Sequence, residues 1–219
     1  MNTTRRTCLS LAGLASGSLL VKAAEPPADC DLLALFAKRQ SVRRYKPDPV
    51  PEEHLRRILD AARRAPTSGN QQPWKFLVVR DRVKIDRMKA RCIERSTIGG
   101  NSLSTTEREA RRKTVEERMA GYFSAPVYIV VLTDSESEYP SYNHHDGPMA
   151  AGYLMLAARA LGYGTVYITD SIPEEITREV LAIPARYQRV CITPLGIPAG
   201  WPDPSPKKKL EDLVAYETL

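Results

Sequence analysis

A long apolar helix constrains the fold of this chain more than any other feature. The segment from Gly147 to Leu161 is rich in alanine and leucine and carries little charge. A helix that is apolar all round is buried in the interior of a protein. Apolar runs typical of buried strands occur at residues 125–132 and 189–196, on either side of it in the sequence. We therefore expect this helix to be central to the fold.

The other predicted elements alternate between helices and strands. Pro51 suits the first turn of a helix that runs to Ala62 with apolar residues at helical spacing. The charge-rich stretch from Lys84 to Met119 predicts two helical pieces, broken near residues 99–101. Shorter elements are predicted as strands over 74–79 and 166–168 and as a helix over 173–181. Strands separated by helices are typical of an α/β or α+β sandwich, and 219 residues without an internal linker favour one domain.

An arginine-rich turn precedes these elements. In Arg39-Gln40-Ser41-Val42-Arg43-Arg44-Tyr45, guanidinium groups surround a small hydroxyl. Arginine forks bind phosphate oxygens in pairs, and a serine hydroxyl can add a further hydrogen bond. The turn therefore suits a phosphate monoester, with a solvated basic turn as the alternative.

A polar turn precedes the first predicted strand. It reads Ala65-Pro66-Thr67-Ser68-Gly69-Asn70-Gln71-Gln72-Pro73-Trp74 and is rich in amides and hydroxyls. Such groups can bind the edge of a planar heterocycle or a polyol. The alternative is an ordinary turn, because proline, serine, glycine and asparagine favour turns without any ligand. Together, the two blocks favour a ligand with a phosphate at one end and a hydrogen-bonding ring at the other.

Four motifs in this order resemble the FMN-dependent nitroreductase family. The first two blocks match R-x-S-x-R-x-[YF] and P-[ST]-x-x-N-x-Q-P-W, and residues 157–165 match A-A-x-x-L-G-x-G-T. Residues 207–211, Lys-Lys-Lys-Leu-Glu, are similar to the family's basic closing motif. The resemblance implies an α+β fold, namely a three-layer α/β/α sandwich with a mixed, mainly antiparallel central sheet. It also implies FMN as the cofactor and an intertwined homodimer with FMN at the interface.

The resemblance also implies which residues contact FMN. The first block would hold the phosphate, the second would reach the flavin ring, often from the partner subunit, and the basic motif would return to the phosphate. Residues 168–170 match the family position where backbone approaches the N5 edge of the ring. The expected cofactor-binding residues are Arg39, Gln40, Ser41, Arg43, Pro66, Thr67, Ser68, Asn70, Ile168, Thr169, Asp170, Lys207 and Lys208.

The activity implied by the resemblance is that of an FMN-dependent oxidoreductase. Electrons would pass from a reduced donor, of the NAD(P)H type in the family, to electron-poor acceptors such as nitroaromatics or quinones in a ping-pong cycle. No catalytic side chain is expected, because the flavin carries the chemistry. The alternative is an exported flavin-binding or electron-carrier protein without a substrate of its own.

The chain departs from the family pattern at two sites. Tyr167 stands where many relatives have tryptophan, and Thr169-Asp170 follow Ile168 where many relatives have a glycine. A carboxylate beside the ring would repel an anionic reduced flavin, so we expect Asp170 to turn away and cap the helix near Pro173. The closing motif has lysines where the family usually offers an arginine and a proline, and a solvated lysine run is the alternative.

Other classes of site are disfavoured. No G-x-G-x-x-G motif follows a predicted strand and no Walker-type loop occurs, which argues against standard Rossmann and P-loop sites. No concentrated basic stripe with interleaved aromatics occurs, so nucleic acid is not an expected partner. The adjacent His144 and His145 are not expected to bind a metal, because neighbouring residues seldom point to one ion. We expect the two histidines and the flanking Asn143 and Asp146 to cap the central helix or to border the substrate pocket.

The N-terminus resembles a twin-arginine export signal. Arg5 and Arg6 precede an uncharged run over residues 7–21 that is short for a membrane span, and Val21-Lys22-Ala23 fits a small-x-small cleavage site. The predicted organisation is a leader over 1–23, a linker over 24–30 and an FMN-binding domain over 31–219. A functional leader implies a periplasmic or otherwise exported protein, whereas a frayed apolar terminus would leave it cytoplasmic. No stable membrane span is expected.

Three cysteines remain beyond the leader, namely Cys30, Cys92 and Cys191. Three thiols cannot all pair within the chain, and their spacing matches no zinc motif. Cys191 lies in an apolar run, so we expect it in the core.

Overall fold

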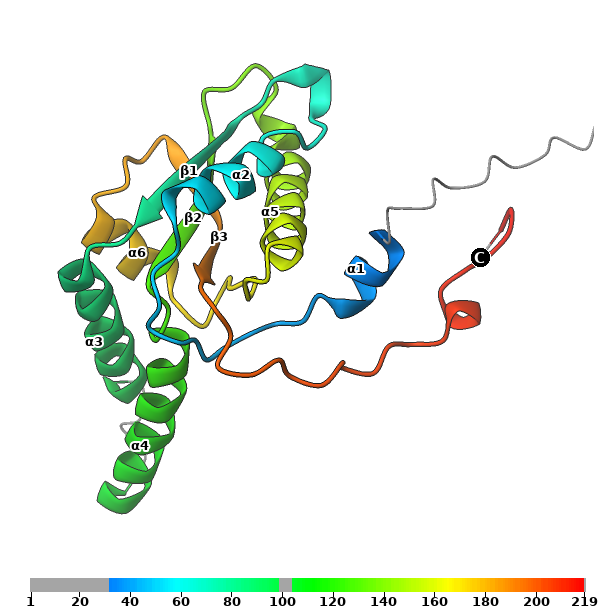
Figure 1. The fold of residues 1–219 in the computed structure, drawn as a ribbon. Helices are drawn as coiled ribbons and strands as arrows, with labels where there is room; N and C mark the ends of the chain where they lie inside the picture. Colours follow the sequence, from blue (N-terminus) through cyan, green and yellow to red (C-terminus); the bar gives the residue numbers. More distant parts are fainter. Residues whose placement is uncertain (1–31, 99–103, 219) are drawn as a thin grey trace, which may run out of the picture. The chain divides into compact units, whose positions relative to one another are not determined.

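The computed structural model describes residues 32–98 and 104–218 (Figure 1). The predicted leader over 1–23, the linker over 24–30 and the expected helix break near 99–101 lie outside the described residues. No helix in the part of the chain that is described is long and apolar enough to cross a membrane.

A three-stranded antiparallel sheet lies at the centre of the described domain (Figure 1). Its strands are β1 (Trp74–Val79), β2 (Val127–Asp134) and β3 (Tyr187–Leu195), with β2 in the middle. Val130 of β2 pairs with Ile192 of β3, and every residue of β2 except the last, Asp134, is buried. The three strands predicted here are confirmed, with ends that differ by at most two residues.

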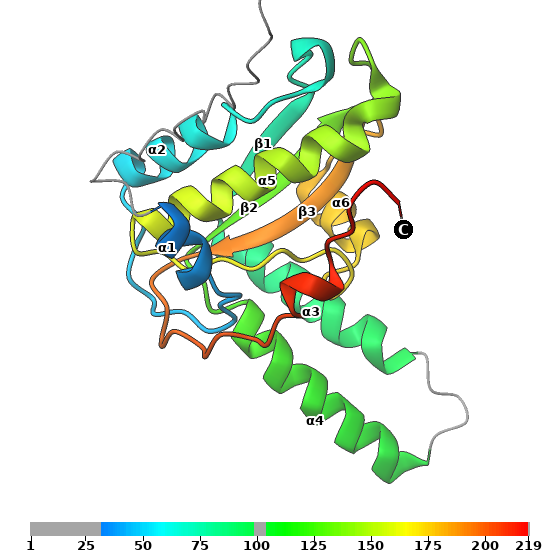
Figure 2. The same cartoon turned by 90° about the vertical axis from the view of Figure 1, so that its right-hand side faces the viewer.

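One face of the sheet is covered by two helices. They are α2 (Glu52–Ala62) and α5 (Asn143–Ala160), which Figure 2 shows lying across the strands. Ile129 and Val131 of β2 point to this face, because alternate residues of a strand point to opposite sides. They pack with buried apolar residues of both helices.

The opposite face carries three further helices. They are α3 (Arg82–Ile98), α4 (Thr105–Tyr122) and α6 (Glu174–Leu181). Tyr128 and Val130 of β2 point to this face and pack with all three. Helices on both sides of a mainly antiparallel sheet make the three-layer α/β/α sandwich that was predicted.

The central helix is confirmed, but it begins earlier than expected. α5 starts at Asn143 rather than at Gly147, and its buried residues pack against α2 and the sheet. A Cβ at Gly147 would lie 2.4 Å from a methyl carbon of Val190 in β3. The glycine therefore allows the helix to approach the sheet closely at this end.

Residues 164–168 form an irregular edge instead of the predicted strand over 166–168. Single β-bridges join Gly164 to Gly196 and Ile168 to Ile192, and neither extends into a ladder. A parallel bridge joins Thr165 to Ser41, which adds the mixed component of the predicted sheet.

The ends of the described domain are short helices. α1 (Leu32–Lys38) precedes the arginine-rich turn, and a single 3₁₀ turn, Leu210–Asp212, lies near the C-terminal end.

Candidate functional site

The arginine-rich turn after α1 is held against the segment that follows α5. Ser41 bridges Thr165, and the Val42 N–H donates to the Thr165 carbonyl at 2.9 Å. A Cβ at Gly164 would lie 2.7 Å from the Val42 Cβ, so a glycine is needed for this close approach. Two motifs that are far apart in the sequence are therefore adjacent in space.

Two side chains of this turn have no protein partner. The Arg39 guanidinium and the Ser41 hydroxyl are half-buried and make no hydrogen bond or ion pair with any described residue. Arg43 donates to the Ser41 carbonyl at 3.1 Å and lies 3.4 Å from the Tyr122 hydroxyl, and Gln40 bonds to a carbonyl of α1. An unpaired cation beside a free hydroxyl suits an anionic ligand.

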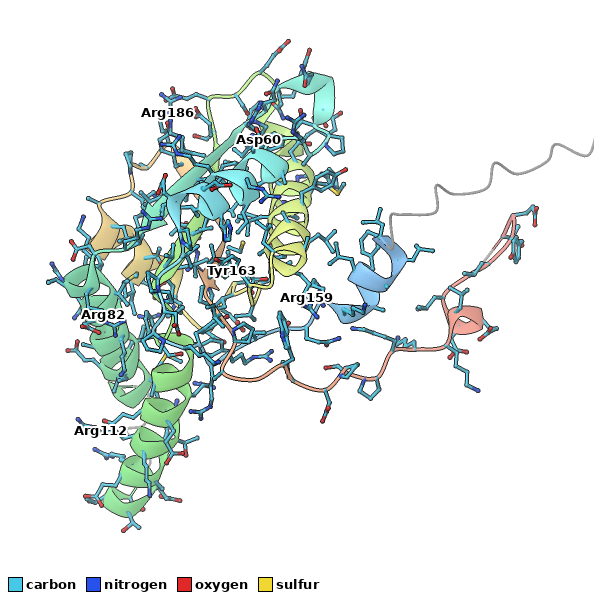
Figure 3. The ribbon with its side chains drawn as sticks, in the orientation of Figure 1. Asp60, Arg82, Arg112, Arg159, Tyr163 and Arg186 are labelled. Carbon is cyan, nitrogen blue, oxygen red and sulfur yellow. The ribbon has the colours of Figure 1, made fainter. Side chains whose placement is uncertain are left out.

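Arg159, near the end of α5, connects this turn to the C-terminal tail. Its Nε donates to the Lys38 carbonyl at 2.9 Å, and its guanidinium lies 3.8 Å from the centre of the Trp201 ring. Figure 3 shows Arg159 where α5 meets the segment that follows α1. Sequence reasoning missed this residue, because it fills an unspecified position of the A-A-x-x-L-G-x-G-T motif.

The polar turn before β1 is held at the other end of α5. The Asp146 carboxylate accepts the Ser68 N–H at 3.1 Å and the Gln71 side-chain amide at 2.7 Å. Gln71 also accepts the Tyr139 N–H at 2.8 Å. Asp146 is buried at the start of α5, where the helix dipole favours a negative charge. It was predicted only as a capping or pocket residue, and its hydrogen bonds to the turn were not foreseen.

The backbone of this turn is strained and depends on those contacts. Gly69, Asn70 and Gln72 have φ values of 57°, 58° and 48°, in the left-handed region that side chains rarely adopt. Pro66, Thr67 and Ser68 precede them, and the Thr67 hydroxyl accepts the Gln72 N–H at 3.2 Å. Such conformations persist where the surrounding structure enforces them, and they are common at binding sites.

The two predicted halves of the site lie at opposite ends of α5 within one chain. Asp146 holds the polar turn and Arg159 holds the arginine-rich turn, and they are 13 residues apart on the same helix (159 minus 146). At 1.5 Å per residue this separation is about 20 Å. A ribityl phosphate has about as many bonds as two amino-acid residues and spans about 8 Å. The distance between the two turns along α5 is therefore longer than the ribityl phosphate alone.

The segment predicted to face the flavin N5 edge runs beside β3. The Ile168 N–H donates to the Ile192 carbonyl at 3.2 Å and its carbonyl accepts the Ile192 N–H at 3.0 Å, so its backbone is fully used. The N–H groups of Thr169 and Asp170 make no hydrogen bond within the described residues. Those two N–H groups, rather than that of Ile168, are available to a ligand.

The prediction that Asp170 caps α6 is wrong. This helix begins after Pro173, and no side chain accepts a hydrogen bond at its N-terminus. Glu174 and Glu175 instead place acidic groups in its first turn, which also favours the helix dipole. Asp170 is exposed, and the carbonyl before it is held by Arg189, which sequence reasoning did not single out.

The closing lysines lie in an extended, exposed tail. Lys207 and Lys208 make no hydrogen bond or ion pair with any residue in the described ranges. Their predicted return to the phosphate stays a prediction.

The histidines and cysteines serve no metal site in the described part of the chain, where no group of three His, Cys, Asp or Glu side chains could hold an ion. His144 and His145 lie exposed in the first turn of α5, and no side chain caps that helix, so the capping role predicted for them is wrong. Burial raises the pKa of the Cys92 and Cys191 thiols to about 12. Both thiols are therefore protonated at neutral pH, and Cys191 lies in the core as predicted.

Among the described residues, the Arg39 and Ser41 side chains are unpaired, and they belong to the turn that bridges Thr165. The edge that follows Thr165 carries two free N–H groups. This arrangement suits a cofactor that joins a phosphate to a hydrogen-bonding ring. Residues 36–197 match the Nitroreductase family, and the chain belongs to that family. It is accordingly an FMN-dependent oxidoreductase of the nitroreductase type.

Three similar proteins illustrate the range of the family. The chain is 29% identical over 208 residues to an NADH dehydrogenase of Thermus thermophilus, covering 90% of this chain and all of that protein. It is 32% identical to an iodotyrosine deiodinase of Thermotoga neapolitana, covering 86% of this chain and 98% of the relative. A crystal structure of oxidized iodotyrosine deiodinase bound to FMN and 3-iodo-L-tyrosine is 27% identical, with a TM-score of 0.71 over 86% of this chain and 100% of that chain.

Proposed function

We propose that FMN binds with its phosphate at the arginine-rich turn and its ring edge at residues 169–170. The observation that carries this proposal is the pair of unpartnered groups on Arg39 and Ser41, next to the bridge from Ser41 to Thr165. From Thr165 to Thr169 the extended chain spans four residues, about 13 Å. That length accommodates a ribityl chain of about 8 Å and the near part of a ring.

The site is completed by a second copy of the chain. Arg39 follows the segment held by Arg159 at one end of α5, whereas Pro66, Thr67, Ser68 and Asn70 belong to the turn held by Asp146 at the other end. We place them at the flavin of the partner, as the family resemblance implies.

Exposed apolar side chains support a homodimer. They occur on α1, on one side of α5 and in the tail, and they include Leu33, Phe36, Tyr142, Met149, Tyr153, Leu213 and Tyr216. Exposed apolar surface of this kind marks an interaction site. In a homodimer these side chains would be buried at the interface. The tail would bring its lysines to the other subunit.

The proposed reaction passes two electrons from an NAD(P)H-type donor to an electron-poor acceptor such as a nitroaromatic or a quinone. Bound FMN supplies the electron transfer, accepting a hydride and then giving up the electrons. The protein holds the phosphate at Arg39 and Ser41, orients the ring edge by backbone N–H groups, and excludes water with apolar surfaces. If donor and acceptor use the same face in turn, the kinetics are ping-pong.

Export of the folded protein with its cofactor is part of the proposal. The twin-arginine route moves folded proteins, so FMN could be inserted in the cytoplasm first. NAD(P)H is scarce outside the cytoplasm, and an exported enzyme would then use another reduced donor.

An anaerobic titration tests the proposed reaction. Protein purified without added flavin should show flavin absorbance bands that bleach on addition of NADH or NADPH and recover on addition of a nitroaromatic or a quinone. Bands that persist with nicotinamides but bleach with dithionite would favour the electron-carrier alternative. Colourless protein that does not bind added FMN would contradict the proposal.

Reductive dehalogenation is a second candidate, because an iodotyrosine deiodinase is 32% identical over nearly its whole length. In this reaction the reduced protein would supply two electrons and a proton to an iodophenol, releasing iodide and the phenol. Iodide release from 3-iodotyrosine by the reduced protein would support it. If the flavin absorbance bands of the reduced protein return on addition of a quinone but not of 3-iodotyrosine, reductive dehalogenation is excluded.

A further inference from the structure

Arg189, near the start of β3, holds the loop that carries the two free N–H groups. Its side chain is half-buried and donates to the Ile172 carbonyl at 2.6 Å, to the Thr177 hydroxyl at 3.0 Å and to the Thr169 carbonyl. The three acceptors come from the loop before α6 and from α6 itself. The planar fork of an arginine can hold several acceptors at once, which a lysine cannot do.

Arg189 makes no ion pair with any residue that the structure describes, unlike many arginines of this chain. Arg186, for example, pairs with Asp134 on the surface, whereas all side-chain bonds of Arg189 go to neutral oxygens. Burial lowers the pKa of the Arg189 guanidinium, and the nearby Glu174 opposes this shift. An arginine pKa lies so far above neutrality that the group keeps its charge.

The hydrogen bond to Thr169 determines where the next N–H points. The Thr169 carbonyl and the Asp170 N–H belong to one planar trans peptide, so they point in opposite directions. Because Arg189 holds the carbonyl on the protein side, the Asp170 N–H points away from Arg189. The charged Arg189 guanidinium, which donates to this carbonyl, also polarises the peptide and makes the Asp170 N–H a stronger donor.

We propose that Arg189 is a positioning residue that aims the Asp170 N–H at the edge of the bound flavin and places a fixed positive charge behind that edge. This inference rests on the proposed FMN site. The positive charge offsets the repulsion between the Asp170 carboxylate and the reduced cofactor, whose ring carries negative charge. Arg189 thereby favours binding of reduced over oxidised FMN.

The test compares Arg189→Met with Arg178→Met. Arg178 is a matched control, because it also holds loop carbonyls, those of Ile183, Pro184 and Tyr187, but none between Thr169 and Ile172. We expect Arg189→Met to weaken binding of reduced FMN about tenfold relative to oxidised FMN. For a two-electron couple this change lowers the midpoint potential by about 30 mV. Arg178→Met should leave the potential unchanged.

Arg189→Lys keeps the positive charge but loses the planar fork that holds several carbonyls. It also provides the test if Arg189→Met does not fold. It should keep a midpoint potential close to that of the wild type, while hydrogen exchange at the Asp170 amide of the FMN-bound protein becomes faster. Equal potentials in the wild type, Arg189→Met and Arg178→Met would overturn the inference, as would unchanged Asp170 exchange in a folded Arg189→Lys variant. A wild-type protein that binds no FMN would instead contradict the proposed function.

Discussion

Arg39 stands out at the scale of single residues, because its charge has no partner in the described chain. Surface arginines such as Arg63 and Arg64 share the carboxylate of Asp60, which lowers the pKa of that carboxyl through two hydrogen bonds. A half-buried cation without such a partner loses hydration and gains nothing in return. A bound phosphate would supply the missing interaction.

Arg39→Met should therefore weaken FMN binding. A hydrogen bond to a charged group contributes about 1.5–3 kcal/mol, so we expect the dissociation constant of FMN to rise about tenfold to hundredfold. Fluorescence titration of the apoprotein measures this constant. Riboflavin, which lacks the phosphate, is the matched ligand control and should bind both proteins equally. Equal weakening of riboflavin and FMN would show that Arg39 does not act on the phosphate.

The buried thiol of Cys191 predicts a pH dependence of stability. Its pKa is about 12 in the folded protein, raised by burial, against about 8.5 in an unfolded chain. Its contribution to stability is therefore complete below about pH 8.5 and is lost as pH rises toward 12. Above about pH 9 the unfolding free energy should fall by about 1.4 kcal/mol per pH unit from this group. Urea unfolding at pH 7, 9 and 10 should show a shallower decline for Cys191→Ala, and identical slopes would contradict the assignment.

At the scale of elements, α5 holds the polar turn at its N-terminal end and the arginine-rich turn at its C-terminal end. Its apolar residues pack against α2 and the sheet, while Asp146 and Arg159 hold the polar and the arginine-rich turns. The distance between the two turns therefore depends on the length of one helix. This arrangement keeps each turn rigid with respect to the core.

Asp146→Ala should destabilise the domain and loosen the polar turn. The Ser68 N–H and the Gln71 amide would lose their acceptor, at a cost of about 1–3 kcal/mol in unfolding free energy. Asp170→Ala is the control, because that carboxylate is exposed and should change stability by less than about 0.5 kcal/mol. Urea unfolding at pH 7 compares them. Equal stabilities of the two variants would mean that Asp146 does not hold the turn.

Much of this architecture could be predicted from the sequence. Periodicity and composition located the three strands, the central helix and the two helices of the charge-rich stretch, since each is a long run with one dominant pattern. The irregular edge at 164–168 could not be predicted, because Val166-Tyr167-Ile168 looks like a strand and only its single bridges to distant segments define it. The roles of Asp146, Arg159 and Arg189 also depend on contacts between distant segments, which local patterns do not encode.

At the scale of the whole molecule, the two turns are held at opposite ends of one helix, and our proposal gives each flavin one turn from each of two copies. The family to which the chain belongs is typically dimeric, and the exposed apolar residues of α5 and the tail agree with an assembly of two copies. The FMN phosphate would then be bound by one copy and the ring in part by the other. Cofactor binding and dimer formation should therefore be linked.

Mixed dimers test whether each flavin site combines turns from two copies of the chain. One copy carries Arg39→Met and the other Asn70→Glu, so each copy is defective in a different turn. If each site combines the arginine-rich turn of one copy with the polar turn of the other, a mixed dimer contains one intact site and one site with both defects. FMN bound per mixed dimer, measured by absorbance after isolation with two affinity tags, should be about half that of the wild-type dimer. No recovery of FMN binding, relative to dimers of either variant alone, would contradict the account, because both turns would then belong to the same copy.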